Sequence, residues 1–320
     1  MEEKERDESQ DANRIAVSRR GFLKAGAGLG AIAATGLALD LSKTDAEVAA
    51  PAQKPFPLKG YSLPLTPKGQ SSIADAPPWH YGGDCLRLTF KADEKKVAAL
   101  IPPPLEMGPN PGQGAVVFQE WVSVSEARPD LAFINPERAI YRECLVTLSC
   151  QYKGEPGNFV PYIWVDNDFT LARGFIQGYP KKLGRIYLTR LHELTPKVGG
   201  RQVGAKVKGI CDVNAQRIIE CSMTFTRPSE PSELPSARKS YLMRHFPSIE
   251  DPTRPVVHEL TVPIVSNVKI KDVWGGDAQI KFFESPFEEV ADLGPIEAQG
   301  AFFYSRGMTV SGGKVIHKYV

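Results

Sequence analysis

The chain has 320 residues, of which 42% are hydrophobic and 24% are charged, as in ordinary globular proteins. The formal net charge is only +2, and there is no basic stripe with interleaved aromatic residues, so composition argues against a nucleic-acid partner. Beyond an N-terminal leader, the length suffices for one large all-β or α/β domain or for two smaller ones.

The N-terminus has the layout of a cleavable export signal. A polar start is followed by Ser18-Arg19-Arg20-Gly21-Phe22-Leu23-Lys24, an apolar run of mostly Ala and Gly over 25–39, and small residues around Val48-Ala49-Ala50. The paired arginines indicate a twin-arginine signal, and the apolar run is shorter than the ~20 residues that span a bilayer. We predict a signal and leader over 1–50, export to the periplasm or beyond, and no stable membrane insertion after cleavage.

The first elements of the mature chain follow from proline content and alternation. Residues 51–77 are rich in proline and predict an extended linker or strap ahead of one domain over 78–320. Cys85 to Lys91 alternates between apolar and polar residues, which predicts a half-buried strand. Asp93 can cap a short helix that stops before Pro102-Pro103-Pro104.

Two later strands carry acidic residues in apolar company. The strand predicted over 115–124 contains Glu120, and the one that starts near Ile140 and ends at Tyr152 contains Glu143. Alternation puts Glu143 on the polar face of its strand, and on that strand alone a solvent-facing glutamate is the simplest interpretation. A strand over 159–165 then ends at Asp166-Asn167-Asp168, which can cap a short helix from Phe169 to about Ile176.

The remaining chain consists mostly of strand-like runs separated by turns. These runs cover 185–194, 202–213, 217–226, 256–272, 279–283, 298–304 and 314–319. Many strands with few helices predict a mainly β fold, an antiparallel sandwich or barrel. Dinucleotide, phosphate-loop and serine-hydrolase motifs are absent from the sequence.

The five cysteines give no metal site. None forms a Cys-x-x-Cys pair, no histidine pair stands near them at zinc spacing, and most lie in apolar runs, which favours buried thiols. One disulfide remains possible, and at least one cysteine is left unpaired within the chain. Asp166 and Asp168 have a metal-compatible spacing, but a turn with a helix cap explains them more simply.

The segment Gly174-Phe175-Ile176-Gln177-Gly178-Tyr179-Pro180-Lys181-Lys182-Leu183-Gly184 contains adjacent lysines in apolar surroundings. A lysine amine becomes a nucleophile only when it loses its proton, and its reference pKa is about 10.4. Burial and a neighbouring cation both lower this pKa, and the segment offers both. The simplest alternative is two solvated surface lysines.

Several collinear motifs resemble the acetoacetate decarboxylase family, and the similarity runs from about Pro78 to Tyr319. The lysine signature Gly178-Tyr179-Pro180-Lys181-Lys182-Leu183-Gly184 is the most specific of them. The others are Leu100-Ile101-Pro102-Pro103-Pro104-Leu105-Glu106, Tyr141-Arg142-Glu143, the strand from Gly157-Asn158-Phe159 to Val165-Asp166-Asn167, and Trp274-Gly275.

The resemblance implies a closed antiparallel β-barrel or cone in a homo-oligomer that works without a cofactor. It implies that Lys181 forms a Schiff base with a ketone or keto acid, with Lys182 as the neighbouring cation. Glu143 would be the active-site acid and Glu120 a second acid, although Gln119 takes that place if the alignment has no one-residue gap. Activation of a lysine by desolvation or a nearby cation is the strategy established for this family.

Two departures from the family pattern bear on the substrate. The place of a common carboxylate-binding arginine falls at Gly82-Gly83-Asp84, and the family's Gly-Arg-Glu is Gly174-Phe175-Ile176 here. Arg87, Arg142 and Arg173 are the candidates to compensate. The sequence therefore predicts a Schiff-base lyase that decarboxylates a β-keto acid. The alternatives are aldolase or dehydratase chemistry on the same lysine, and a barrel that binds a small ligand without catalysis.

Overall fold

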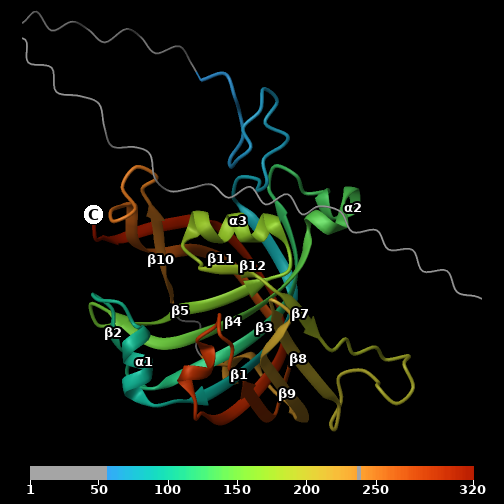
Figure 1. Cartoon of the computed structure of the whole chain (residues 1–320). Coiled ribbons are helices and arrows are strands. Elements are labelled where there is room, and N and C mark those ends of the chain that lie inside the picture. Colours follow the sequence, from blue (N-terminus) through green and yellow to red (C-terminus); the bar gives the residue numbers. More distant parts are fainter. Residues whose placement is uncertain (1–55, 236–238) are drawn as a thin grey trace, which may run out of the picture. The chain divides into compact units, whose positions relative to one another are not determined.

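One twelve-stranded sheet dominates the computed structural model of the chain, which describes residues 56–235 and 239–320 (Figure 1). The strands are β1 (Trp79–Lys91), β2 (Glu106–Met107), β3 (Gln113–Ser125), β4 (Ile140–Tyr152), β5 (Glu155–Val165), β6 (Lys181–Leu183), β7 (Arg185–Leu188), β8 (Lys206–Val213), β9 (Gln216–Pro228), β10 (Lys239–Pro247), β11 (Pro255–Phe282) and β12 (Glu297–Lys318). The helices are α1 (Glu94–Leu100), α2 (Leu131–Ile134) and α3 (Asp168–Gln177), with short 3-10 turns η1 (Pro136–Arg138), η2 (Pro231–Glu233) and η3 (Val290–Leu293).

The strand order closes part of the sheet into a ring. The path runs β10-β5-β4-β3-β1-β12-β11-β9-β8-β7, and β10 also pairs with β11. Seven strands from β10 round to β11 therefore form a closed circuit, which removes the sheet edges along it. The mainly β barrel predicted from the sequence is confirmed, except that β5 pairs in parallel with β10 and with β6.

Local sequence signals account for most element boundaries. The Asp93 side chain caps α1 by accepting hydrogen bonds from the backbone of Lys95 and Lys96, as predicted. Asn167 caps α3, which ends at Gly178 with a φ of 102°, a conformation that favours glycine. The strand expected over 185–194 ends earlier, at Leu188. The backbone N–H of Thr189 still donates to the carbonyl oxygen of Lys208, and the chain leaves the sheet beyond it. The runs 256–272 and 279–283 belong to the single long β11, and 298–304 and 314–319 belong to β12.

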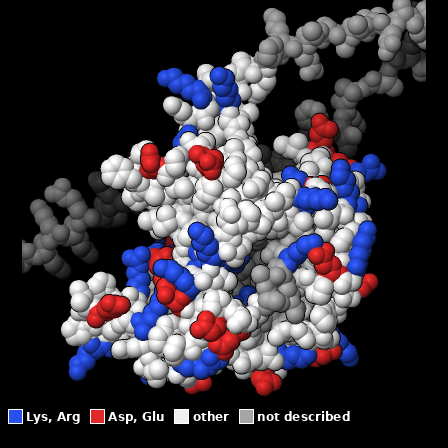
Figure 2. Space-filling model, turned by 180° about the vertical axis from the view of Figure 1, so that it is seen from behind, with Lys and Arg blue, Asp and Glu red and all other residues white. Residues whose placement is uncertain are grey.

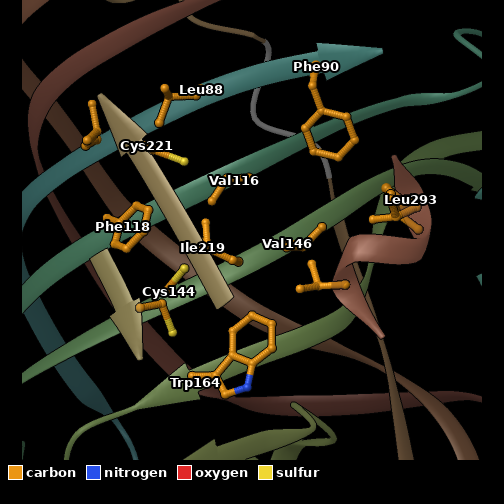
Figure 3. Close-up of a cluster of buried hydrophobic side chains, with 14 of the residues drawn as sticks. Leu88, Phe90, Val116, Phe118, Cys144, Val146, Trp164, Ile219, Cys221 and Leu293 are labelled. Atoms are coloured by element: carbon orange, nitrogen blue, oxygen red, sulfur yellow. The ribbon is translucent and has the colours of Figure 1, made fainter. Parts of the chain in front are cut away.

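The two faces of the sheet bury two different sets of side chains. The main core lies on one face, where side chains from β1, β3, β4 and β5 meet those of β8 and β9 (Figure 3). It includes Leu88, Phe118, Val146, Trp164 and Ile219. All five cysteines are buried free thiols, as the apolar runs predicted.

A second apolar cluster lies on the opposite face of β1, β3, β4 and β12. Its buried members are Cys85, Trp121, Tyr141, Val165, Phe169, Val273 and Tyr304. Phe169 comes from α3, which contacts β5, β6, β10 and β11. We call this side of the sheet the site face, because the functional residues described below lie on it.

The described part of the predicted linker is attached to the domain. Ala74 is buried, Ser62 and Ala74 are hydrogen-bonded, and Arg138 donates to the carbonyl oxygens of Ser72 and Ile73. The predicted signal over 1–50 lies outside the described residues. Its cleavage and the export of the chain stay predictions, as does a homo-oligomer.

Charged side chains of both signs are interspersed on the face of the molecule shown in Figure 2. That view gives no support to a continuous basic surface, in agreement with the low net charge. Within residues 56–235 and 239–320, no helix has the length and apolar character to cross a bilayer.

Candidate active site

Lys181 is the centre of the candidate site, and its side chain enters the domain interior. It opens β6, a three-residue strand that pairs in parallel with Ile163–Val165 of β5. Only 7% of Lys181 is exposed. Its Nζ lies 2.6 Å from the Thr170 hydroxyl and 3.2 Å from Oε2 of Glu143. The simplest alternative, a solvated surface lysine, is therefore wrong for Lys181.

Glu143 is held by two neighbours from different strands. Its Oε1 accepts a hydrogen bond from Nε1 of Trp121 at 3.0 Å, while its Oε2 accepts from Lys181. Only 8% of Glu143 is exposed, so the solvent-facing interpretation of this residue is wrong. Both faces of β4 are largely buried, so Glu143 on its polar face is enclosed like the apolar residues on the other face.

Aromatic rings surround the Lys181 amine. The ring centres of Tyr141 and Tyr179 lie 5.3 and 5.7 Å from Nζ. Burial raises the pKa of both phenols, that of Tyr141 well above its ordinary value, so both rings stay neutral. Neutral rings keep the amine in a dry environment without adding a second negative charge.

The pKa of Lys181 is lowered from its ordinary value, chiefly because burial disfavours the ammonium form. The carboxylate of Glu143 opposes this shift, and the positive charge of Arg173 adds to it. Desolvation outweighs the carboxylate, so the amine gives up its proton more readily than a free lysine does. This is the condition for nucleophilic attack on a carbonyl carbon.

Arg173 is a buried cation on α3, one helical turn after Thr170. Only 2% of it is exposed. Its Nη1 donates to the Ser123 hydroxyl at 2.8 Å, and its guanidinium lies 5.1 Å from the Trp79 ring and 4.9 Å from the Phe169 ring. Among the residues that the structure describes, no carboxylate comes within 4 Å of Arg173, and its buried Nε has no hydrogen-bond partner. Buried charges are normally paired, so the guanidinium of Arg173 is suited to bind an anion.

Lys182 lies on the other side of β6 from Lys181. Its ammonium pairs with Glu288, and half of its side chain is exposed. Consecutive residues of a strand point to opposite faces, which explains why the two lysines separate. Lys182 was predicted to be the neighbouring cation of Lys181. The structure instead puts Arg173 in that position.

Glu120 also lies away from Lys181. Its carboxylate pairs with Arg142 at 2.9 Å and with Arg190 at 3.1 Å. The β3–β4 register sets Gln119, not Glu120, opposite Glu143. Gln119 is buried and contacts the thiol of Cys85. The structure thus brings Lys181 and Glu143 together and leaves Lys182 and Glu120 outside the site.

The three arginines proposed to compensate for the missing family arginine have different surroundings. Arg142 pairs with Glu120 and Asp166. Arg87 lines a separate cavity of about 310 Å³ together with polar side chains such as Thr147. Only Arg173 adjoins Lys181. Sequence reasoning did not assign roles to Thr170 or Trp121, although Thr170, Arg173 and Gly174 share one face of α3 at helical spacing.

Gly174 leaves the space that the Lys181 side chain fills. A Cβ at position 174 would lie 2.6 Å from both Cγ and Cδ of Lys181. We expect Gly174→Ala to displace the amine and to lower the rate of imine formation with a ketone by at least about tenfold, since small misplacements at a reacting centre are costly. Single-turnover borohydride trapping measures this rate. Ala172→Ser, on the same helix, is the control for a general effect on α3. An unchanged rate in Gly174→Ala would contradict the assignment.

Comparisons with known proteins now identify the family. Residues 62–320 match the family model described as acetoacetate decarboxylase (ADC). The chain belongs to the acetoacetate decarboxylase family. The match begins sixteen residues ahead of Pro78, where the sequence motifs had placed its start.

Relatives of this acetoacetate decarboxylase family member carry more than one activity in their names. The acetoacetate decarboxylase of Acidiphilium cryptum (strain JF-5) is 24% identical over 264 residues, which cover 81% of this chain and 96% of that protein. The enduracididine biosynthesis enzyme MppR, solved in complex with pyruvate, is 30% identical with a TM-score of 0.76, over 82% of this chain and 99% of that one. An acetoacetate decarboxylase-like enzyme from Sphingomonas wittichii RW1 is 29% identical with a TM-score of 0.76, over 81% and 100%.

Proposed function

We propose that this member of the acetoacetate decarboxylase family is a Schiff-base enzyme for keto acids, with Lys181 as the nucleophile. The observation that carries the proposal is the buried Lys181 amine, 3.2 Å from Glu143 and in the field of Arg173, which has no carboxylate partner among the described residues. The amine supplies the imine nitrogen, Glu143 moves protons, and Arg173 holds the carboxylate of the substrate. None of these steps needs a cofactor.

The shared first step follows from these positions. The neutral Lys181 amine attacks the ketone carbon, the carbonyl oxygen leaves as water after gaining protons, and a protonated imine remains. Glu143 is within reach to deliver and accept these protons through its Oε2. A bond on the carbon beside the imine then breaks, and its electron pair moves towards the positive nitrogen, which produces an enamine.

The second step decides the reaction, and we propose that the carboxylate is retained. In this reaction Glu143 removes a proton from the carbon beside the imine, which gives the enamine. The enamine then forms a new carbon–carbon bond to an aldehyde, and the product loses water. A guanidinium on the carboxylate stabilises its negative charge, which disappears when carbon dioxide leaves, so Arg173 favours retention. MppR, at 30% identity, has been solved with the condensation product of pyruvate and imidazole 4-carboxaldehyde, which is a product of this kind.

Decarboxylation of a β-keto acid, the activity predicted from the sequence, is the second candidate. In that reaction the bond to the carboxylate breaks, its electrons move to the imine nitrogen, and the resulting enamine is protonated. The relatives named acetoacetate decarboxylase support it at 22% to 24% identity. The same lysine serves both reactions, so product analysis separates them.

Borohydride trapping tests the proposal directly. Incubation with pyruvate or acetoacetate and then borohydride should leave a reduced adduct on Lys181, seen by intact mass and peptide mapping. Because the pKa of Lys181 is lowered, trapping should rise with pH and level off below the ordinary pKa of lysine. Lys181→Met should lose the adduct completely, and Lys182→Met is the matched control that should keep it.

The outcome also separates the enzyme from a ligand-binding barrel. No adduct with any keto acid up to about pH 9, where more of the amine is free, would contradict the Schiff base and favour the non-catalytic alternative. If an adduct forms, incubation with an aldehyde follows. Carbon dioxide release from acetoacetate supports decarboxylation, and a heavier condensation product with pyruvate supports carboxylate retention.

A further inference from the structure

A second arginine, Arg306, lies on the site face of the barrel and takes no part in the steps above. It belongs to β12, where side chains alternate between the two faces. Tyr304 and Met308, two residues away on either side, both pack in the cluster that contains Trp121 and Tyr141. The Arg306 side chain therefore points to the same side of the sheet as the candidate site.

The register of the sheet puts Arg306 in line with the walls of the site. Arg306 pairs with Gly83, Gly83 with Trp121, and Trp121 with Tyr141. Directly opposed residues of antiparallel strands lie on the same face, so these four positions form one row across β12, β1, β3 and β4. The row ends at Tyr141, whose ring contacts Lys181. Gly83 contributes no side chain, so nothing in the row separates Arg306 from Trp121.

Arg306 has a charge without a partner among the described residues. Its side chain makes no ion pair within 4 Å and no hydrogen bond there, and its Nε is buried. Asp84, which follows Gly83 on the paired strand β1, lies on the opposite face. There its carboxylate is bound by Arg201 and Ser305. The positive charge of Arg306 also offsets part of the rise that burial causes in the pKa of Tyr179, which faces Lys181. The field of this guanidinium thus reaches the site.

We propose that Arg306 binds a second carboxylate, so that the natural substrate is a keto diacid. This inference rests on the proposed function, in which Arg173 takes the carboxylate beside the ketone. Two separate guanidinium groups on one face, each without a carboxylate partner among the described residues, match a substrate with an anionic group at each end. A monoacid would satisfy one of them and leave the other without a partner.

Trapping with matched acids tests the proposal on the whole protein. The diacids oxaloacetate, 2-oxoglutarate and 2-oxoadipate are compared with pyruvate and 2-oxohexanoate, and the concentration for half-maximal borohydride trapping is measured for each. We expect at least one diacid to be bound about 10- to 100-fold more tightly than the monoacids, the effect of one charged hydrogen-bonded contact. This comparison uses the unmodified chain and does not depend on the folding of a variant.

Variants then test whether Arg306 causes the preference for the diacid. Arg306→Gln should abolish the preference for the diacid, because diacid trapping weakens about 10- to 100-fold more than monoacid trapping, and Arg306→Lys should restore part of the preference. Arg254→Gln, at an exposed position, is the control. Equal affinities for diacids and monoacids in the unmodified chain would overturn the inference, although monoacid trapping would still support the Schiff base. Failure of every keto acid to be trapped would overturn the proposed function itself.

Discussion

Replacing Glu143 with glutamine is expected to lower turnover of a keto acid by about 10²–10⁴-fold, because an amide cannot carry a proton between the substrate and water. The same change should lower the pKa of Lys181 further, since the Glu143 carboxylate is the group that raises it. Borohydride trapping should therefore reach its plateau at a lower pH while product formation falls. These opposite changes distinguish a proton carrier from a residue that only supports the fold.

Glu120→Gln is the matched control for that experiment. Glu120 was predicted to be a second acid, yet it pairs with Arg142 and Arg190 away from Lys181. We expect its replacement to change turnover by less than about threefold, as for a change to a partly exposed ion pair. A larger loss in Glu120→Gln than in Glu143→Gln would reverse the two assignments and return Glu120 to the site.

Replacing Arg173 with methionine is expected to weaken keto-acid binding by about 10- to 100-fold, the loss of a buried, charged hydrogen-bonded contact. Methionine preserves apolar packing against Trp79 and Phe169. The pKa of Lys181 should rise, because Arg173 contributes to its lowering. Trapping measured against concentration and pH gives both quantities in one series.

A ketone without a carboxylate provides the control for Arg173. Butanone has nothing for the guanidinium to bind, so its half-maximal concentration should be the same in the Arg173→Met variant and the unmodified chain once pH is adjusted for the new pKa. Equal weakening for butanone and for pyruvate would show that Arg173 shapes the pocket and does not bind the acid. Arg173→Lys should recover only part of the affinity, because an ammonium lacks the planar fork.

The stability of the Lys181→Met variant provides a separate check on burial. Between the lowered pKa of Lys181 and its ordinary value, the unfolded chain holds a proton that the native chain lacks, so this group makes stability rise with pH. Its cost to the native state is greatest below the lowered pKa. As the pH rises through this window, the unfolding temperature of the unmodified chain should therefore rise relative to that of Lys181→Met.

The positions predicted correctly from sequence are those set by local rules. The signature around Lys181 identified the family, and alternation along β4 separated Glu143 from its apolar neighbours. Asp93 and Asn167 marked helix starts because capping depends on only a few consecutive residues. The strand pattern as a whole was enough to predict a mainly β barrel.

The positions predicted wrongly depend on which face of the sheet is enclosed. Alternation placed Glu143 on the face opposite its chain neighbours, but a sheet with one wet face and a barrel with two buried faces have the same period. Packing of β8 and β9 on one face and of α3 on the other buried both faces of β4, which enclosed Glu143. Alternation along β6 places Lys182 on the face opposite Lys181, where it pairs with Glu288.

The sequence by itself determined the family and the strand-rich fold and pointed to the lysine that we propose for imine formation, because these depend on short contiguous motifs. Only the tertiary structure decided which charges surround that lysine. Thr170 and Arg173 come from a helix, Trp121 from β3, and Glu143 from β4, which is buried on both faces. Contacts between distant segments arise from register and closure, which no local pattern encodes.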